Sequence, residues 1–262
     1  MAKRFPGFPA AGMEFLRGLE RNNNREWFQE HKAIFETQVK APMERLVEII
    51  NGALAGFAPE HVSDPRRAIY RIYRDTRFSQ DKTPYKTHIG ATFARRGLDR
   101  HGGAGYYFSA SPQGVEVAGG IYMPGPAELL AVRNFLAGHH AEVARLACGK
   151  ALRSLMGDLQ GDELKRAPKG FPADHPGLGL LRKKQWYFYV VLPGEIAVTP
   201  AIAAEVVKRF RALAPFVDLL NRPLSGEGLR PARELRSHLL LGEPQPPRGE
   251  RRRPARLQKS RW

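Results

Sequence analysis

The chain has 262 residues, of which 42% are hydrophobic and 26% charged, and its 42 Lys and Arg outnumber its 26 Asp and Glu by 16. This composition is typical of a soluble globular protein and excludes a collagen-like or wholly disordered chain. No stretch approaches the roughly 18 apolar residues of a membrane-spanning helix, and the segment Met1–Pro9 lacks the apolar region of a signal peptide. Because Cys148 is the single cysteine and cannot form an internal disulfide, we expect a cytoplasmic protein that does not enter a membrane.

The first part of the chain is predicted to be helical. Apolar residues between Glu14 and Leu19 mark a first helix, and Asn23 with Glu26 three residues later has capping-box spacing for a second. Pro42 marks the expected break before a third helix, whose apolar residues recur at helical spacing as far as Leu54.

The middle of the chain changes to a period of two. Residues 67–75 and 85–95 alternate with a β-rich composition. Residues 106–109 and 115–123 flank the turn sequence Ser111-Pro112-Gln113-Gly114. These segments predict an antiparallel meander.

The last third returns to helix. A helix is predicted to begin at Pro126 and to close at Gly138. Trp186–Leu192 is a strand that is apolar on both faces, so we expect it in the centre of the sheet or covered on both sides. With a long helix after Pro200, the pattern predicts one α+β domain over residues 1–222, with a central, mainly antiparallel sheet and N-terminal helices.

The positive charge is concentrated in two segments. Residues 226–262 hold ten Lys or Arg, four Glu and several Pro, so we expect residues 223–262 to form a mostly disordered basic tail. This tail is interpreted either as a solubilising extension or as a nucleic-acid-binding arm. Residues 66–96 hold nine Lys or Arg and two Asp, a net charge of +7. A field of this sign favours nucleic acid, acidic lipid headgroups or anionic metabolites.

The segment that joins the first two predicted strands holds most of this second charge. Strand parity places Arg74 on the face of the apolar Ile72, where its guanidinium must reach a carboxylate, an anionic ligand or water. Lys86 and His88 are expected to project together from the following strand, about 6 to 7 Å apart. Arginine, lysine and hydroxyl groups in combination suit an oxyanion. We therefore predict an anion-binding site that comprises Arg74, Asp75, Arg77, Ser79, Asp81, Lys82, Tyr85, Lys86 and His88.

Three interpretations of this segment remain open. In the first, the segment binds a phosphate-bearing partner, nucleic acid or a small molecule, without catalysis. In the second, the protein is an enzyme that acts on a small phosphorylated or carboxylated compound, with Asp75 or Asp81 as an acid–base group. In the third, the segment is purely structural: Arg74 pairs with Asp81, Arg77 pairs with Asp75, and these ion pairs fix the turn.

No metal or cofactor site is predicted. The segment Gly102-Gly103-Ala104-Gly105 precedes a strand and lacks the Lys-Ser/Thr pair that follows a phosphate-binding loop. The spacings HExxH, CxxC and EF-hand do not occur. We therefore expect no cofactor and no metal, and we assign no catalytic residue.

The charged segment also resembles a known family signature. The motif R-D-x-R-F-S-x-D-K-x-P-Y-K at Arg74–Lys86 resembles that of a widespread family of bacterial and fungal proteins classed as a domain of unknown function. Three further features are similar to the same family: N-N-x-R-E-W-F at Asn22–Phe28, the Gly119-Gly120 pair and P-K-G-F-P-x-D-H-P at Pro168–Pro176. The resemblance covers residues 5–222. It implies a single domain and the importance of the motif, and it implies no activity, cofactor or catalytic residue.

Overall fold

The computed structural model of the protein describes residues 4–77 and 79–225, which fall within one compact unit. From residue 226 onward, the predicted basic tail lies outside the described residues. The strands are β1 (Ile89–Phe93), β2 (Gly105–Ala110), β3 (Gly114–Ile121) and β4 (Trp186–Pro193). The α-helices are α1 (Ala10–Arg21), α2 (Arg25–Glu30), α3 (Lys32–Ile34), α4 (Ala41–Leu54), α5 (Pro65–Ala68), α6 (Pro126–Ala147), α7 (Lys150–Met156), α8 (Leu178–Arg182) and α9 (Ala201–Asn221).

Two details of the helical first part differ from the prediction. Asn24, not Asn23, caps α2, because its side chain accepts a hydrogen bond from the Trp27 N–H at 2.9 Å. Pro42 does not separate two helices, since it lies at the start of α4 and helical backbone continues on both sides of it. A π-helical segment, Phe35–Lys40, joins α3 to α4.

The antiparallel meander is confirmed, with strand order β1-β2-β3-β4. At the predicted turn, the Ser111 N–H donates to the Gly114 carbonyl at 3.0 Å. The strand expected at 67–75 is wrong: Asp64 caps the short helix α5, and only isolated bridges at Ile69 and Tyr73 follow it. The strand expected at 85–95 is shorter than predicted, since β1 covers Ile89–Phe93.

The position predicted for the doubly apolar strand is also wrong, because β4 lies at the edge of the sheet. Trp186 and Phe188 are buried, whereas Tyr187 and Tyr189 on the opposite face are half-buried. Tyrosine suits such a face because its hydroxyl can reach a polar partner. Gln160 covers part of the edge: its N–H donates to the Tyr187 carbonyl at 2.8 Å and its side-chain amide to the Tyr189 carbonyl at 3.1 Å.

The long C-terminal helix is confirmed as α9, while α6 runs past its expected end. Gly138 does not close α6, which continues to Ala147 with one non-helical residue, His139, at φ −124° and ψ 16°. In the described part of the chain, no helix has both the length and the apolar character needed to cross a bilayer.

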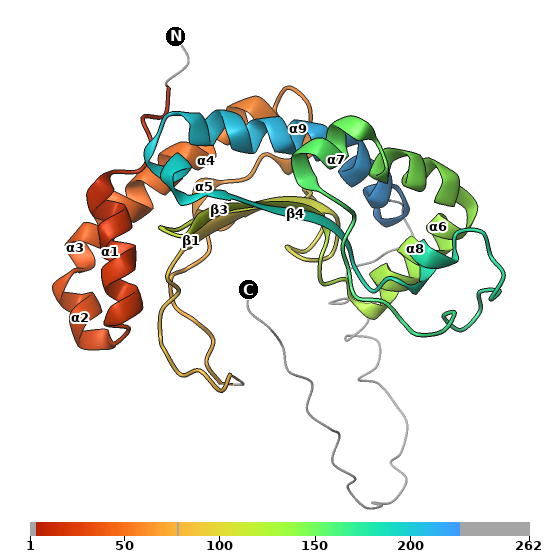
Figure 1. Ribbon diagram of the computed structural model, residues 1–262, viewed down its shortest axis with the longest axis horizontal. Helices are drawn as coiled ribbons and strands as arrows, with labels where there is room; N and C mark the ends of the chain where they lie inside the picture. The colour runs from red at the N-terminus through yellow and green to blue at the C-terminus, as the bar shows by residue number, and fades with distance from the viewer. Residues whose placement is uncertain (1–3, 78, 226–262) are drawn as a thin grey trace, which may run out of the picture. The chain divides into compact units, whose positions relative to one another are not determined.

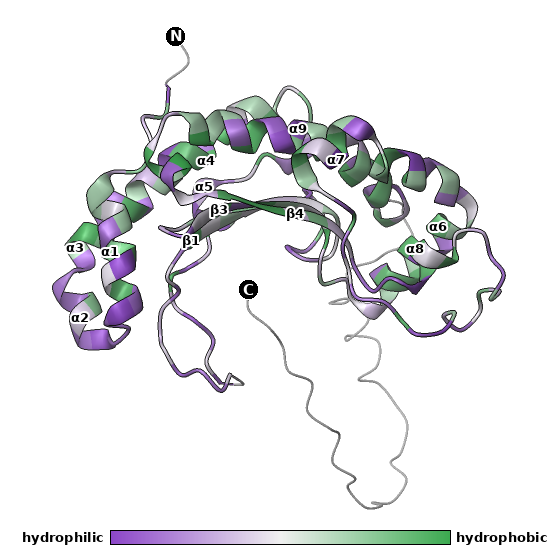
Figure 2. Cartoon of the chain, in the orientation of Figure 1, coloured by the Kyte–Doolittle hydropathy of each residue, from purple (hydrophilic) through white to green (hydrophobic). Residues whose placement is uncertain are grey.

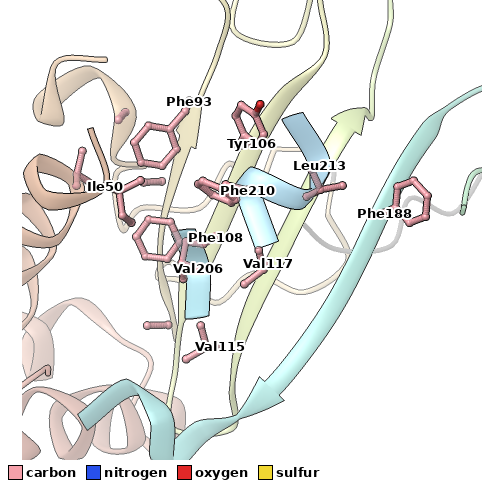
Figure 3. Packing of buried hydrophobic residues seen from close by; sticks show 14 of the residues in the cluster. Ile50, Phe93, Tyr106, Phe108, Val115, Val117, Phe188, Val206, Phe210 and Leu213 are labelled. Carbon is pink, nitrogen blue, oxygen red and sulfur yellow. The ribbon is translucent and has the colours of Figure 1, made fainter. Parts of the chain in front are cut away.

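The core lies between the sheet and the helices α4 and α9, which pass over one of its faces (Figure 1). Figure 3 shows Phe210 of α9 among the side chains of β1 and β2. Its ring centroid lies 5.6 Å from that of Phe93 and 4.9 Å from that of Tyr106. All three side chains are almost fully buried. The packing of α9 against the sheet confirms the α+β class.

The other face of the sheet carries polar side chains. In Figure 1 the described helices lie above this sheet and at its sides. Along β3 the side chains alternate between buried residues, which face α9, and half-buried ones, which face away from it. Polar and aromatic residues on strands β2, β3 and β4 therefore share the face that points away from α9, on which Ser109 is buried and Glu116, Tyr187 and Tyr189 are half-buried.

The Gly119-Gly120 pair tests this packing. A Cβ at Gly120 would lie 2.1 Å from the Trp186 carbonyl oxygen, and its φ of +131° disfavours other residues, whereas a Cβ at Gly119 would meet the flexible end of Leu213 at 2.8 Å. We expect Gly120→Ala to lower the free energy of unfolding by about 2–4 kcal/mol and Gly119→Ala by about 1 kcal/mol, as measured by urea denaturation. Equal losses for the two variants would contradict the described backbone.

Candidate functional site

The charged segment forms a hairpin arm, defined here as residues 72–86 apart from 78. The Arg74 N–H donates to the Pro84 carbonyl, and the Lys86 N–H donates to the Ile72 carbonyl, each at 2.8 Å. Tyr73 and Tyr85 form an isolated antiparallel bridge between these bonds. Figure 2 shows that the arm is mainly hydrophilic. The arm leads into β1 (Figure 1). Lys86 and His88 directly precede this strand.

The base of the arm is attached to the N-terminal helices through Tyr85. The Asn23 side-chain amide donates to the Tyr85 carbonyl at 2.9 Å, and its oxygen accepts from the Tyr85 N–H at 3.0 Å. The Tyr85 ring is buried and stacks on Phe28 at a centroid distance of 4.2 Å. The two sequence motifs at 22–28 and 74–86 therefore meet at Tyr85, whose backbone binds Asn23 and whose ring stacks on Phe28.

Within the arm, the charged side chains bind one another. Arg74 lies 2.5 Å from Asp81 and also donates to the Thr83 hydroxyl. Arg77 donates two side-chain hydrogen bonds to Asp75, at 3.0 and 2.7 Å. These bonds hold the pKa of Asp75 at about 2. The Thr83 N–H, Arg74 and the Thr83 hydroxyl likewise hold the pKa of Asp81 well below its usual range.

These pairs are the ones that the purely structural interpretation predicts. The Lys82 ammonium donates to the Thr76 carbonyl at 2.9 Å, and the Ser79 N–H donates to the same carbonyl at 3.4 Å. Most charged members of the predicted anion site therefore have partners inside the arm. Two of the nine predicted residues, Lys86 and His88, follow these paired charges and lie directly before β1.

Strand register defines a surface that we call the open face. Gly90 of β1 pairs with Ser109 of β2, which pairs with Glu116 of β3. His88 has the same parity as Gly90 and precedes it by one pleat. The open face comprises His88, Gly90, Thr92, Tyr107, Ser109, Glu116, Ala118, Tyr187 and Tyr189.

Cations gather around Tyr70 at one end of the open face. The Tyr70 N–H donates to the Gly90 carbonyl at 2.9 Å, which fixes this residue beside β1. The Lys86 ammonium lies 4.8 Å from the centroid of the Tyr70 ring, and the Arg100 guanidinium lies 4.4 Å from it. Burial lowers the pKa of Lys86, and the charges of Arg71, Arg100 and Arg74 lower it further.

We call Tyr70, Arg71, Lys86 and Arg100 the Tyr70 cluster. Arg100 donates to the backbone carbonyls of Arg67 and Ala68. Among the residues that the structure describes, no ion pair joins Arg71, Lys86 or Arg100 to a carboxylate. The cluster thus differs from the arm, where each arginine has an acidic partner.

Tyr107 connects the Tyr70 cluster to the middle of the open face. Its ring lies 6.2 Å from that of Tyr70, edge to face. A Cβ at Gly90 would lie 2.9 Å from the Tyr107 hydroxyl, so a glycine there lets the phenol cross β1. Burial raises the pKa of Tyr107, and a hydrogen bond with Ser109 opposes this shift.

Glu116 lies at the centre of a hydrogen-bonded group on the open face. Its two carboxylate oxygens accept bonds from the Tyr189 hydroxyl at 2.9 Å and from the Ser109 hydroxyl at 2.8 Å. Burial lowers the pKa of His88, the charge of Glu116 opposes this shift, and the charge of Lys86 adds to it. The Glu116 carboxylate and the His88 imidazole therefore interact electrostatically beside the Tyr70 cluster.

Most of the open face was missed in the sequence. Sequence reasoning named Lys86 and His88 but omitted Tyr70, Arg100 and Glu116 as site residues. The available signal was alternation: Glu116 interrupts the apolar run of its strand at the parity opposite to the core residues. The grouping of these side chains depends on strand order and register, which no local pattern specifies.

The fold and this surface together define an α+β domain whose sheet has one helix-covered face and one open polar face. A family model described as "Conserved hypothetical protein (DUF2461)" matches residues 11–219, and the chain belongs to this family. The family expected from the sequence motifs is thereby confirmed. Comparisons with curated proteins and with solved structures find no match. In the described ranges, no group of three or more His, Cys, Asp or Glu is placed to hold a metal ion.

The attachment of the arm can be tested at Asn23. Asn23→Ala removes both hydrogen bonds to the Tyr85 backbone, and we expect it to lower the free energy of unfolding by about 2 kcal/mol. The neighbouring Asn22 is exposed and bonds only within its own helix, so Asn22→Ala should cost less than about 0.5 kcal/mol. Urea denaturation of both variants measures the difference, and equal values would show that Asn23 does not hold the arm.

Proposed function

We propose that the protein binds a phosphate-bearing ligand on the open face, with a phosphate group at the Tyr70 cluster. The observation that carries this proposal is the position of Lys86 and Arg100 around the Tyr70 ring, with no carboxylate paired to either among the described residues. In the arm beside them, by contrast, Arg74 and Arg77 are each paired with an aspartate.

An anion at this position would relieve an unfavourable arrangement of charge. Lys86 is half-buried, and the charges of three arginines act on it. Partial burial and like charges both disfavour its charged form. A phosphate bound there would favour that form, and the Arg100 guanidinium, whose Nη2 binds the Arg67 and Ala68 carbonyls, would donate from its other nitrogens. A bound anion would therefore offset the positive charges of the cluster.

Nucleic acid is the ligand whose chemistry fits the remainder of the open face. Tyr70 and Tyr107 offer aromatic surface beside the cations, and Tyr187 and Tyr189 extend it on β4 at the far edge of the sheet. Binding of single strands commonly combines such aromatic surface with a positively charged track for the backbone. The net charge of +16 would draw a polyanion toward the molecule. We place this binding in the cytoplasm, where a single cysteine remains reduced.

Catalysis by Asp75 or Asp81, the alternative considered from the sequence, has less support. Each carboxylate accepts hydrogen bonds from an arginine, and its pKa is lowered. A general base needs a pKa nearer the operating pH, so these two groups are weak proton acceptors. Their pairs favour a structural role for the tip of the arm.

The proposal is tested by removing the charge of Lys86 in the full chain. Lys86→Gln should weaken binding of a fluorescent single-stranded RNA about tenfold and reduce the slope of log affinity against log salt by about 0.7. Lys208→Gln removes an exposed lysine from α9, on the other side of the sheet, and is the matched control. Fluorescence anisotropy measures both. Equal affinity of the two variants would contradict the proposed site.

A further inference from the structure

His61 is a buried histidine whose two ring nitrogens have different surroundings. It ends the short 3₁₀-helical segment η2 (Pro59–His61), and the Tyr106 ring of β2 meets its ring edge to face at a centroid distance of 4.9 Å. Nδ1 lies 3.0 Å from the Phe93 carbonyl oxygen, which can only accept, so Nδ1 carries a proton. Nε2 is buried and has no hydrogen-bond partner within the part of the chain that the structure describes. The ring is therefore held in its neutral form, with the proton on Nδ1.

We propose that His61 is an acid-sensitive latch between η2 and the end of β1, a role that goes beyond the proposed ligand binding. A second proton has to bind Nε2, where the positive charge would be buried without an acceptor. A buried charge without a hydrogen-bonded partner is far more costly than a buried neutral ring. Protonation therefore favours a state in which η2 has separated from β1 and Nε2 reaches water.

The charged groups that face His61 do not supply the missing acceptor. The Glu60 carboxylate lies 3.8 Å from Nε2, beyond hydrogen-bond reach, and is paired with Arg95 at 3.4 Å. Arg95 also lies 3.9 Å from Asp218 of α9. Burial lowers the pKa of His61. The carbonyl bound to Nδ1 and the two carboxylates oppose this shift, and the charge of Arg95 adds to it.

The latch fastens the start of the connection between β1 and β2. The Arg96 N–H donates to the Glu60 carbonyl at 2.8 Å, and the Arg96 guanidinium donates to the Pro59 carbonyl at 3.4 Å. Together with the bond from His61, these contacts join residues 59–61 to residues 93–96. The connection continues to Arg100, whose guanidinium belongs to the Tyr70 cluster. Opening of the latch therefore loosens the segment that leads to Arg100.

The direction of the pH effect follows from the lowered pKa of His61. An exposed histidine gains its second proton below about pH 6.5, whereas buried His61 does so only at lower pH. Between these two values the opened chain binds more protons, so acid favours opening. The stabilisation by the neutral ring is complete above about pH 6.5 and is lost as the pH falls, by at most about tenfold in the folding equilibrium constant per pH unit.

The test compares the full chain with His61→Asn by urea denaturation between about pH 8 and pH 5. Asparagine keeps an N–H donor for the Phe93 carbonyl and does not titrate. Burial also lowers the pKa of His88 and His101, so only the difference between the two chains isolates His61. The unchanged chain should be the more stable at pH 8, and its advantage in folding equilibrium constant should shrink about tenfold between pH 7 and pH 5.

The matched control is His139→Asn, which replaces an exposed histidine of α6. The stability difference between this variant and the unchanged chain should stay constant over the same pH range. A constant difference for His61→Asn as well would overturn the inference.

A second measurement uses only the unchanged chain and so does not depend on the folding of a variant. Ring NMR signals should show His61 still neutral at pH 6, with its proton on Nδ1. On further acidification, the Arg96 amide should lose protection from hydrogen exchange before the Ile50 amide of α4 does. A His61 ring that gains its second proton near pH 6.5, or an Arg96 amide that stays as protected as Ile50, would contradict the latch.

Discussion

The packing of α9 and α4 against one face of a four-stranded sheet is the interaction on which the remaining structure depends. It buries Phe93, Phe108 and Phe210 and places every second strand residue in the core. The alternate residues must then satisfy their polar groups on the other face. Ser109 and Tyr189 do so through Glu116. The open face is therefore a consequence of how the core is built.

The hairpin arm has a different part in this arrangement. Its tip is closed by the Arg74–Asp81 and Arg77–Asp75 pairs, and its base is fixed by Asn23. Exposed ion pairs contribute little to stability, whereas the buried Tyr85 ring and its backbone bonds contribute more. The most specific motif of the chain thus orients the segment that carries Lys86 to the sheet.

Patterns in the sequence were sufficient for the fold class and insufficient for the site. Period-two alternation identified three of the four strands of the meander, and the pairs Arg74–Asp81 and Arg77–Asp75 followed from charge and spacing. β4 was misplaced because tyrosines were counted as apolar, although their hydroxyls suit a half-exposed face. Glu116 could not be grouped with Tyr70, because only the strand order and register place both on one face of the sheet.

A ligand bound as proposed contacts the open face and not the tip of the arm. The most direct measurement is a titration of the ¹⁵N-labelled chain with a short single-stranded RNA of 2′-O-methyl nucleotides, followed by amide chemical shifts. We expect the largest changes at Tyr70, Gly90, Tyr107 and Glu116. Changes confined to the arm tip at 75–82, or to residues 226–262, would contradict it.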